Sequence, residues 1–312
     1  MSLLPDFEYR RPGTLKDAIS LLSDYGEEAV LLAGGTALVP RLRLGLKRPN
    51  LVIDIKEMAE DLRYVKNEAG VLRVGCLSTI YEIKKNALIR DNYPSLHEAA
   101  TLMASEDIQQ RGTVGGNILQ DTRCTYYNKS ERWRKGFQSC FKMGGAICNA
   151  AKGGKKCLSV YSGDLAPALI SLGASVCIMS SDGERELPLE DIFSGDGSAP
   201  FSLTGTDFLK EIILPIARKK GGYDKFRLRK SIDYPIANAA FSIDDEHHGR
   251  VVVGSSGPKP FIYDFSSPEE LNKIPGRAYD DMRLINNMSF PPLYRKHLAK
   301  VLVERLIRRD IK

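Results

Sequence analysis

The stretch AVLLAGGTALVPRLRLGLKRPNLVIDI, which spans residues 29–55, indicates how the chain begins to fold. The apolar run Ala29–Leu32 is typical of a short buried strand, and the paired glycines after it predict a tight turn. Residues 37–44 are a helix candidate, and the apolar residues 51–55 are a second strand candidate. A strand, a glycine turn, a helix and a strand in this order predict a small α/β unit.

Similar patterns continue on both sides of this unit. Residues 14–25 have helical spacing, with Thr14 as the expected N-cap and Gly26 just beyond the end. The remaining patterns predict strands at 71–75, 174–179, 208–214, 223–229, 236–243 and 250–254, and helices at 79–86, 95–104, 163–172 and 293–311. Residues 193–206 are rich in Gly, Ser and Thr and are interpreted as a loop, and a domain boundary is predicted near residues 215–221.

A second glycine turn, RGTVGGN, occupies residues 111–117. Paired glycines let the backbone approach a ligand closely and can direct amide groups at an anion. The chain contains neither a GxxxxGK[ST] motif nor a GxGxxG motif, which argues against a P-loop ATPase and a Rossmann dinucleotide site. Either turn alone could be purely structural, whereas two of them in one domain favour a cofactor that contains a pyrophosphate.

The composition is that of an ordinary globular protein, with 43% hydrophobic and 27% charged residues in a chain of 312. The N-terminus lacks the pattern of a signal peptide, and no apolar stretch approaches the ~20 residues of a membrane helix. We therefore expect a cytoplasmic protein with no membrane partner. In that compartment disulfides are rare, and clustered cysteines more often bind metal or carry out redox chemistry.

Residues 124–157 combine four of the six cysteines with eight Lys or Arg and one acidic residue, and they show no clear helix or strand period. The net charge of this segment is +7, whereas that of the whole chain is +6, so the other 278 residues together carry a net charge of −1. A local basic patch predicts a docking site for an acidic partner, with a solvated loop as the alternative. A basic-loop nucleic-acid-binding module is a further alternative, because aromatic residues are interleaved with the charges. These residues are Tyr126, Tyr127, Trp133 and Phe137.

The cysteines of this segment have the spacing C-x15-C-x7-C-x8-C. Four thiolates can bind a tetrahedral zinc ion or an iron–sulfur cubane. The CxxC knuckles of structural zinc sites and the common ferredoxin spacing are both missing, so spacing alone leaves zinc, iron–sulfur and free structural thiols open. The remaining Cys76 and Cys177 lie in apolar strand candidates and are interpreted as buried core residues.

Three stretches resemble signature stretches of the FAD-binding subunit of the molybdenum hydroxylase (xanthine dehydrogenase) family. They are LLAGGTALVPRLRLG (31–45), GTVGGNILQD (112–121) and SGDLAPALISLGA (162–174). Two later stretches, at 223–240 and 292–307, resemble the start and the end of that family's C-terminal domain. The resemblance covers essentially the whole chain, and the five stretches follow one another in the same order as in that family.

The resemblance implies an α+β protein with a PCMH-type (vanillyl-alcohol-oxidase-like) FAD-binding fold. Residues 1–217 would form this domain from two α/β subdomains, at about 1–56 and 57–217, with an insertion at about 121–160. Residues 218–312 would form a C-terminal α+β domain of antiparallel strands and helices, of the CO dehydrogenase flavoprotein C-terminal type.

The resemblance also implies where FAD binds. The two glycine turns would wrap the FAD diphosphate, Asp164 would contact the cofactor, and Lys225 is a weaker candidate. The implied turn residues are Ala33, Gly34, Gly35, Thr36, Ala37, Leu38, Thr113, Gly115, Gly116 and Asn117. The chain departs from the family before its second turn, where Ile108-Gln109-Gln110 replaces Ile-Arg-Asn, which puts in doubt a contact that the arginine makes in relatives.

Asn117 and Asp164 are 47 positions apart, whereas ordinary family members join these elements by a much shorter interval. The inserted pattern resembles that of the β subunits of 4-hydroxybenzoyl-CoA reductases, which carry a [4Fe-4S] cluster. This resemblance implies a cluster bound by Cys124, Cys140, Cys148 and Cys157.

The same resemblance implies an electron-transfer subunit of a molybdenum-dependent aromatic-CoA reductase. An acidic ferredoxin would donate electrons, which would pass through the cluster and FAD to a small [2Fe-2S] subunit and a large molybdenum subunit. Substrate would be reduced on the large subunit, so no catalytic residue is expected in this chain. The alternative is the FAD subunit of a xanthine dehydrogenase-like hydroxylase, which delivers electrons from the flavin to an acceptor.

Overall fold

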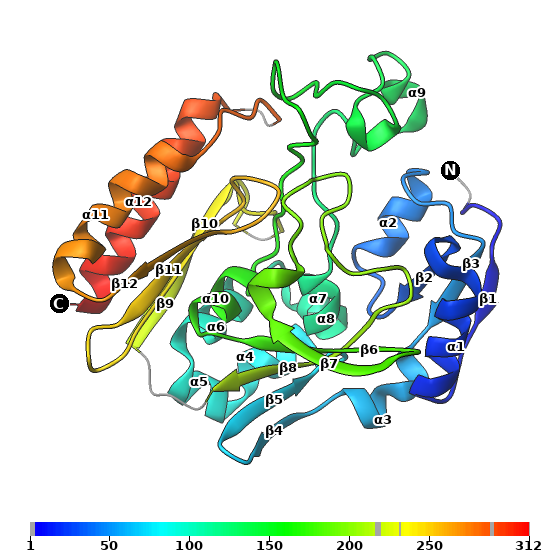
Figure 1. Ribbon diagram of the computed structural model, residues 1–312, viewed down its shortest axis with the longest axis horizontal. Helices are drawn as coiled ribbons and strands as arrows, with labels where there is room; N and C mark the ends of the chain where they lie inside the picture. The colour runs from blue at the N-terminus through cyan, green and yellow to red at the C-terminus, as the bar shows by residue number, and fades with distance from the viewer. Residues whose placement is uncertain (1–3, 216–219, 231, 288–289, 312) are drawn as a thin grey trace.

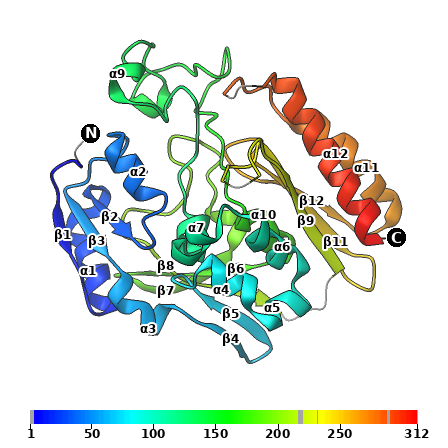
Figure 2. The same ribbon diagram turned by 180° about the vertical axis from the view of Figure 1, so that it is seen from behind.

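The computed structural model describes residues 4–215, 220–230, 232–287 and 290–311. In this part of the chain the strands form three sheets. Figures 1 and 2 show the N-terminal sheet and the C-terminal sheet on opposite sides of a central sheet and its helices. Among the described residues, every helix is too short or too polar to cross a membrane.

The N-terminal sheet is parallel and has the order β1-β3-β2. Its strands are β1 (Glu8–Arg10), β2 (Ala29–Leu32) and β3 (Leu51–Asp54), and its helical elements are α1 (Leu15–Tyr25), η1 (Gly26–Glu28) and α2 (Leu38–Arg43). The Thr14 side chain caps α1 by accepting from the amide of Asp17, and Gly26 follows the helix with φ +50°. The predicted strand, turn, helix and strand are confirmed.

The central sheet has the order β4-β5-β8-β6-β7, with every neighbouring pair antiparallel. Its strands are β4 (Val65–Glu68), β5 (Val71–Gly75), β6 (Ser175–Ser180), β7 (Gly183–Pro188) and β8 (Phe208–Pro215). Sequence patterns indicated β5, β6 and β8 but not the edge strands β4 and β7. Both edge strands are largely exposed and lack an apolar run that would have marked them.

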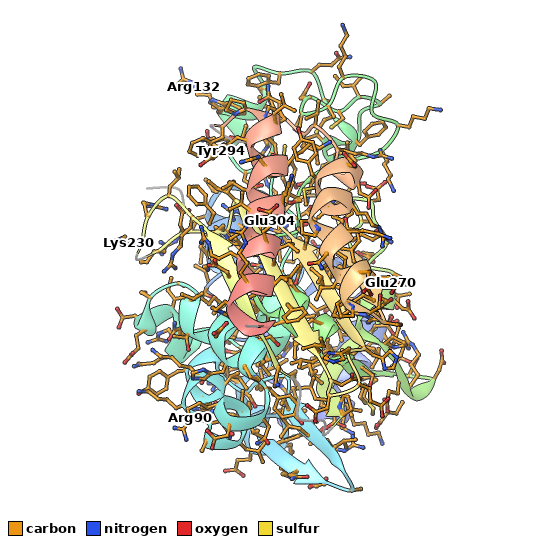
Figure 3. The ribbon with its side chains drawn as sticks, turned by 90° about the vertical axis from the view of Figure 1, so that its left-hand side faces the viewer. Arg90, Arg132, Lys230, Glu270, Tyr294 and Glu304 are labelled. Carbon is orange, nitrogen blue, oxygen red and sulfur yellow. The ribbon has the colours of Figure 1, made fainter. Side chains whose placement is uncertain are left out.

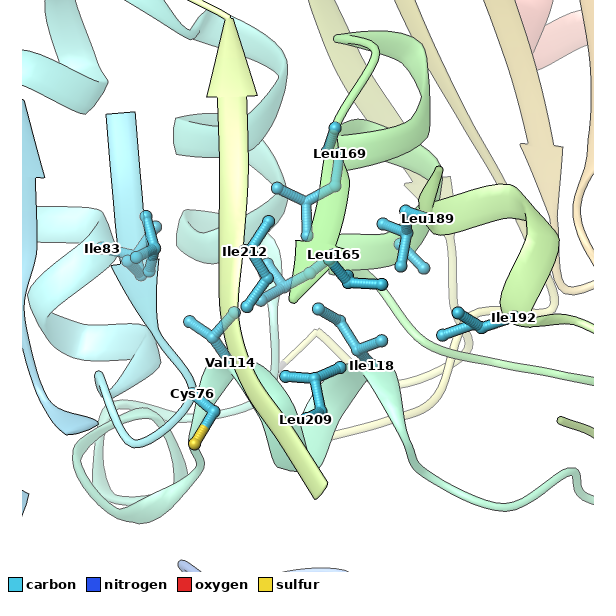
Figure 4. Packing of buried hydrophobic residues seen from close by; sticks show 14 of the residues in the cluster. Cys76, Ile83, Val114, Ile118, Leu165, Leu169, Leu189, Ile192, Leu209 and Ile212 are labelled. Atoms are coloured by element: carbon cyan, nitrogen blue, oxygen red, sulfur yellow. The ribbon is translucent and has the colours of Figure 1, made fainter. Parts of the chain in front are cut away.

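Short helices cover this sheet. They are η2 (Lys56–Met58), α3 (Ala59–Leu62), α4 (Ile80–Lys85), α5 (Ala87–Asn92), α6 (Pro94–Leu102), α7 (Glu106–Arg111), α8 (Val114–Ile118), α10 (Leu165–Ser171) and η4 (Leu189–Ile192). Figure 4 shows Val114 and Ile118 of α8 close to Leu165 of α10 and Leu209 of β8. All four side chains are buried, so the second glycine turn is anchored in the main core.

The cysteine segment projects from this core with little regular structure (Figure 1). Its only helices among the described residues are α9 (Glu131–Arg134) and the short η3 (Phe141–Met143). Arg123 and Val160 form an antiparallel bridge in which each amide donates to the other residue's carbonyl, at 2.7 and 2.9 Å. The segment therefore leaves the body and returns to it at neighbouring points.

The C-terminal sheet is antiparallel and has the order β12-β11-β10-β9. Its strands are β9 (Lys220–Phe226), β10 (Ala237–Ile243), β11 (Gly249–Gly254) and β12 (Phe261–Phe265). Figure 3 shows α11 (Pro268–Asp281) and α12 (Pro292–Ile311) side by side across this sheet, with which they share a second hydrophobic core. Helix α11 was not indicated by the sequence patterns, because Pro275 and Gly276 lie inside it.

The predicted domain boundary at 217/218 falls at residues 216–219, which lie outside the described residues. On either side of them, β8 belongs to the central sheet and β9 to the C-terminal sheet. The division into two domains stays a prediction.

Candidate functional site

The two glycine turns lie against each other, although they are far apart in the sequence. A Cβ atom on Gly34 would overlap the carbonyl oxygen of Arg111, so only glycine allows this approach. Gly35 has φ +74°, which favours glycine as well. The turn that follows β2 therefore lies against the residues that lead into α8.

The turns form one side of a cavity of about 330 Å³. Eleven of the twelve residues predicted to bind the cofactor line it: Ala33, Gly34, Gly35, Thr36, Ala37, Leu38, Thr113, Gly115, Gly116, Asn117 and Asp164. The twelfth, Lys225, does not line it. A cavity of this size, built from backbone turns and a few polar side chains, is typical of a ligand site.

The first turn presents uncommitted backbone donors to this cavity. Among the described residues, no acceptor is paired with the amides of Gly34, Gly35, Thr36 or Ala37. Successive free amides in a turn bind anions such as phosphate groups. The turn therefore has the chemistry that a diphosphate requires.

Lys225 reaches the site indirectly, through Asp164. Its Nζ lies 2.7 Å from Asp164 Oδ1, and the two side chains are 1% and 6% exposed. The hydroxyl of Tyr223 donates to the same oxygen at 2.6 Å, and burial raises the pKa of Tyr223 well above its usual value. Lys225 therefore neutralises and holds the carboxylate of Asp164, which itself faces the cavity.

Several lining residues were not singled out from the sequence. They are Arg41, Gln120 and Asp121 beside the turns, and Arg229, Ile232, Asp233 and Tyr234 from the loop after β9. The Nε atom of Arg41 and the Nε2 atom of Gln120 are buried without a partner in the described part of the chain. Unpaired buried donors are rare in folded proteins, so these two fit a polar or anionic ligand. Both lie in stretches that resemble the family signatures, 31–45 and 112–121, and that resemblance is the signal that could have found them.

Gln109, which stands where the family has an arginine, faces the protein interior. It is 2% exposed, and its Nε2 donates to the carbonyl of Met103 at 2.6 Å. Lys84 donates to its Oε1 at 3.3 Å, while the neighbouring Gln110 is exposed. Of the residues at 108–110, only Ile108 lines the cavity.

A second, small cavity brings the four inserted cysteines together. Cys124, Cys140, Cys148 and Cys157 all line it. Cys140 and Cys157 are buried, at 8% and 6% exposed, and the other two are half-buried. Burial raises the pKa of Cys124 and of Cys157 to about 11, so a bound metal would be needed to hold these groups as thiolates at neutral pH.

The four sulfur atoms do not form a tight group in the described part of the chain. Three or more His, Cys, Asp or Glu side chains could share a metal ion where their ligand atoms all lie within 4.8 Å of one another. Among the described residues there is one such set, Cys177, Glu184 and Glu211. No three of the inserted cysteines therefore come so close. Tetrahedral zinc with bonds of about 2.3 Å would hold its sulfurs about 3.8 Å apart.

Polar groups around the cysteine cavity also lack partners. Ser159 is 1% exposed, lines the cavity, and has a hydroxyl without a partner among the described residues. Arg295 of α12 is 5% exposed, and its Nη2 donates to Asn287 Oδ1 at 2.7 Å while its Nη1 is unpaired in the same part of the chain. Burial lowers the pKa of Arg295 to about 10, and the charge of Cys124 opposes this shift. Four thiols, an unpaired hydroxyl and a buried cation fit an anionic metal–sulfur group.

The set of Cys177, Glu184 and Glu211 is already neutralised by its neighbours. Arg73 lies 2.6 Å from Glu211, and Lys210 lies 2.9 Å from Glu184. We therefore do not interpret this set as a metal site. Cys76 and Cys177 are 3% and 1% exposed, so the prediction that both are buried is confirmed.

Comparisons with known proteins agree with this geometry. A family model described as "FAD binding domain in molybdopterin dehydrogenase" matches residues 5–217. The nicotinate dehydrogenase FAD-subunit of Eubacterium barkeri is 28% identical over 248 residues, which cover 78% of this chain and 71% of that protein. The aldehyde oxidoreductase FAD-binding subunit of Escherichia coli K12 is 28% identical over 292 residues, which cover 88% and 89%.

A solved structure supports the fold over the whole chain. Carbon monoxide dehydrogenase from Hydrogenophaga pseudoflava matches with a TM-score of 0.79 at 21% identity, covering 99% of this chain and 98% of that chain. The predicted α+β class, with a PCMH-type FAD-binding fold and an antiparallel C-terminal sheet, is confirmed.

Proposed function

This chain belongs to the family of FAD-binding domains in molybdopterin dehydrogenases, and on that premise we propose its role in an oxidoreductase complex. It is the FAD and [4Fe-4S] electron-transfer subunit of a molybdenum-dependent aromatic-CoA reductase similar to 4-hydroxybenzoyl-CoA reductase. FAD binds between the two glycine turns, and the cluster is bound by Cys124, Cys140, Cys148 and Cys157. The chain acts in the cytoplasm, where thiols stay reduced.

The proposal is carried by one observation: the four inserted cysteines line a single cavity in a family that binds FAD. A zinc ion would draw four sulfurs close together, whereas a cubane binds each thiolate at a separate iron and holds them farther apart. Because no three of these described sulfurs lie within 4.8 Å of one another, the arrangement favours the cluster over zinc. The unpaired hydroxyl of Ser159 fits a metal–sulfur group of either kind, because metal-bound thiolates and cluster sulfides both accept hydrogen bonds.

The residues of this chain would bind FAD and orient it. The free amides of residues 34–37 would bind the FAD diphosphate, and Asp164, held by Lys225, would orient the cofactor. FAD supplies redox chemistry when bound, and the protein positions it. Its partners would be a small [2Fe-2S] subunit and a large molybdenum-cofactor subunit, and substrate reduction would occur on the large one.

An acidic ferredoxin fits the outer surface of the cysteine segment as electron donor. Lys152, Lys155 and Lys156 are exposed close to Cys157 in the sequence, and Arg132 points away from the body at the outer end of the segment in Figure 3. Charge complementarity of this kind speeds the encounter with an acidic partner.

The experiment that tests the proposal is a measurement of iron, sulfide and flavin in anaerobically purified protein. We expect one FAD, and about four iron and four sulfide per chain, as a cubane on four thiolates requires. Cys140→Ser should lose most of the iron, whereas Cys76→Ser and Cys177→Ser should retain it despite some loss of stability. One zinc per chain without sulfide would reject the cluster and leave the FAD site standing.

A second candidate is the FAD subunit of a xanthine dehydrogenase-like hydroxylase, which delivers electrons from flavin to an acceptor. The similarity to the FAD subunits named nicotinate dehydrogenase and aldehyde oxidoreductase favours it. A protein with FAD but without iron and sulfide, whose flavin is reduced by substrate through the complex, would support this reading.

Three of the aromatic residues that suggested a nucleic-acid-binding module contact one another, although Trp133 and Phe137 are still 38% and 40% exposed. Trp133 and Phe137 pack against each other with ring centroids 4.5 Å apart, and Tyr126 meets Phe137 at 5.4 Å. The guanidinium of Arg134 donates to the carbonyl of Gly45 at 3.3 Å, within the protein. Tight, salt-dependent nucleic-acid binding by a colourless protein would revive this alternative.

A further inference from the structure

Three charged side chains connect the cysteine cavity to the FAD cavity. Lys142 lines the cysteine cavity, and its Nζ lies 2.7 Å from Asp121 Oδ1. Arg41 makes an ion pair with the other carboxylate oxygen, and both Arg41 and Asp121 line the FAD cavity. The side chains of Lys142, Asp121 and Arg41 are 5%, 17% and 24% exposed. The two cavities therefore share one ionic network.

The network has an excess of positive charge. Two cations share one carboxylate, which leaves a net charge of +1 in a largely buried position. A buried net charge is costly unless a further counter-ion is near. On the Lys142 side, the available counter-ions are the thiolates of the cysteine cavity.

Lys142 is held rigidly in this position. Besides the ion pair, its Nζ donates to the carbonyl of Thr122 at 3.1 Å and to the hydroxyl of Thr122 at 2.5 Å. It also lies 5.1 Å from the centre of the Tyr127 ring. An ammonium group with so many fixed contacts cannot turn to solvent, so its charge acts on the cavity at a constant distance.

We propose that Lys142, positioned by Asp121, sets the reduction potential of the cluster bound by the four inserted cysteines. This inference rests on the proposed function. Reduction adds one electron, supplied by the ferredoxin donor, and so adds one negative charge to the cluster. A fixed positive charge beside the thiolates stabilises the reduced form and raises the potential.

Exposed lysines of the same segment should have a much smaller effect. Lys155 is exposed, so water and salt screen its charge, whereas Lys142 acts through the protein interior. This difference provides a matched control within the same 34 residues.

The experiment is a redox titration of the anaerobically purified full chain, in which electron paramagnetic resonance monitors the reduction of the cluster. Iron, sulfide and FAD are measured in each sample. In Lys142→Met, which removes the charge, we expect the reduction equilibrium of the cluster to shift at least tenfold toward the oxidised form, or about 59 mV for one electron. Lys142→Arg and Lys155→Met should stay within threefold of the wild type, and all three should retain iron and FAD.

Asp121→Asn provides a second test, in which the reduction equilibrium of the cluster should shift in the opposite direction. It removes the negative charge that partly offsets Lys142, so the equilibrium should shift toward the reduced form. If Lys142→Met does not fold, Lys142→Gln, which also removes the charge, takes its place and should shift the equilibrium in the same direction as expected for Lys142→Met.

The outcomes separate the two proposals. A wild-type protein without iron and sulfide would reject the proposed cluster before any variant is measured. A wild-type protein with the cluster, but with an unchanged potential in the charge-removing variant of Lys142, would overturn only the role of Lys142. Loss of iron from Lys142→Met, with iron retained in Lys142→Arg, would make Lys142 a residue for cluster assembly and would also overturn it.

Discussion

The side chain of Asn117 accepts a hydrogen bond from the backbone amide of Leu165 at 3.0 Å, across 48 positions of sequence. This bond joins the second glycine turn directly to the start of α10. Close by, the hydroxyl of Tyr161 donates to the carbonyl of Ile118 at 2.8 Å. The parts of the FAD cavity on either side of the cysteine segment are therefore held to each other without using the segment itself.

Removal of the cysteine segment should leave FAD binding intact. Arg123 and Val160 are bridged partners, so a short Gly- and Asn-containing turn can replace residues 124–159. We expect the shortened chain to fold, to retain FAD in its absorbance spectrum, and to contain no iron. A matched variant that keeps the full segment but changes Asn117→Ala should instead weaken FAD binding. Loss of flavin from the shortened chain would show that the segment takes part in the FAD site.

Gly116→Leu should abolish FAD binding without unfolding the protein. Among the described residues, and leaving out the adjacent residues and the helix backbone, only Thr113 Oγ1 lies within 4 Å of a Cβ at this position, at 2.9 Å. Gly116 lines the cavity, so a longer side chain should occupy space in it. Flavin content and circular dichroism measure the two effects. Gly276→Leu is the control, because a Cβ there meets no described atom within 4 Å and Gly276 does not line the cavity. Normal flavin content in Gly116→Leu would rule out the second turn as the FAD site.

Ser159→Ala should lower the reduction potential of the cluster while iron content stays constant. A hydroxyl that donates to a cluster sulfur stabilises the more negative, reduced form. Ser162→Ala, which changes a buried serine outside the cavity lining, should have no such effect. If Ser159→Ala leaves the potential unchanged and raises the melting temperature, its hydroxyl is simply an unpaired buried group.

The ion pair of Asp164 and Lys225 should behave as a coupled unit. Lys225→Met leaves a buried carboxylate without its cation and should destabilise the protein by about 3–5 kcal/mol in urea unfolding. Adding Asp164→Asn to this variant should recover much of the lost stability, because the uncompensated charge is gone. A double variant that is no more stable than Lys225→Met would show that the two charges act independently.

Reversal of the exposed lysines should slow electron delivery without disturbing the cofactors. With Lys152, Lys155 and Lys156 changed to Glu, reduction by ferredoxin should be at least tenfold slower at low ionic strength, and its salt dependence should weaken. Stopped-flow absorbance measures this rate, while dithionite should still reduce the flavin. The control reverses three exposed lysines elsewhere: Lys16, Lys66 and Lys273. Equal rates in the two triple variants would exclude docking at the cysteine segment.

The sequence by itself determined the features that depend on neighbouring residues. The Thr14 cap, the strand Ala29–Leu32 and the two glycine turns are local, since a cap, an apolar run or a positive φ is encoded within a few positions. The resemblance then linked these local features to FAD, and eleven of the twelve implied cofactor residues line one cavity.

Only the tertiary structure decided which charges matter. In the sequence, Lys142 looks like one of eight equivalent positive residues, but folding buries it against Asp121, whereas Lys152, Lys155 and Lys156 remain exposed. Arg295 approaches the cysteine cavity from a helix that begins more than 130 positions after Cys157. Burial and charge pairing arise from contacts between distant segments, and no local pattern encodes them, because water screens a side chain until the fold excludes it.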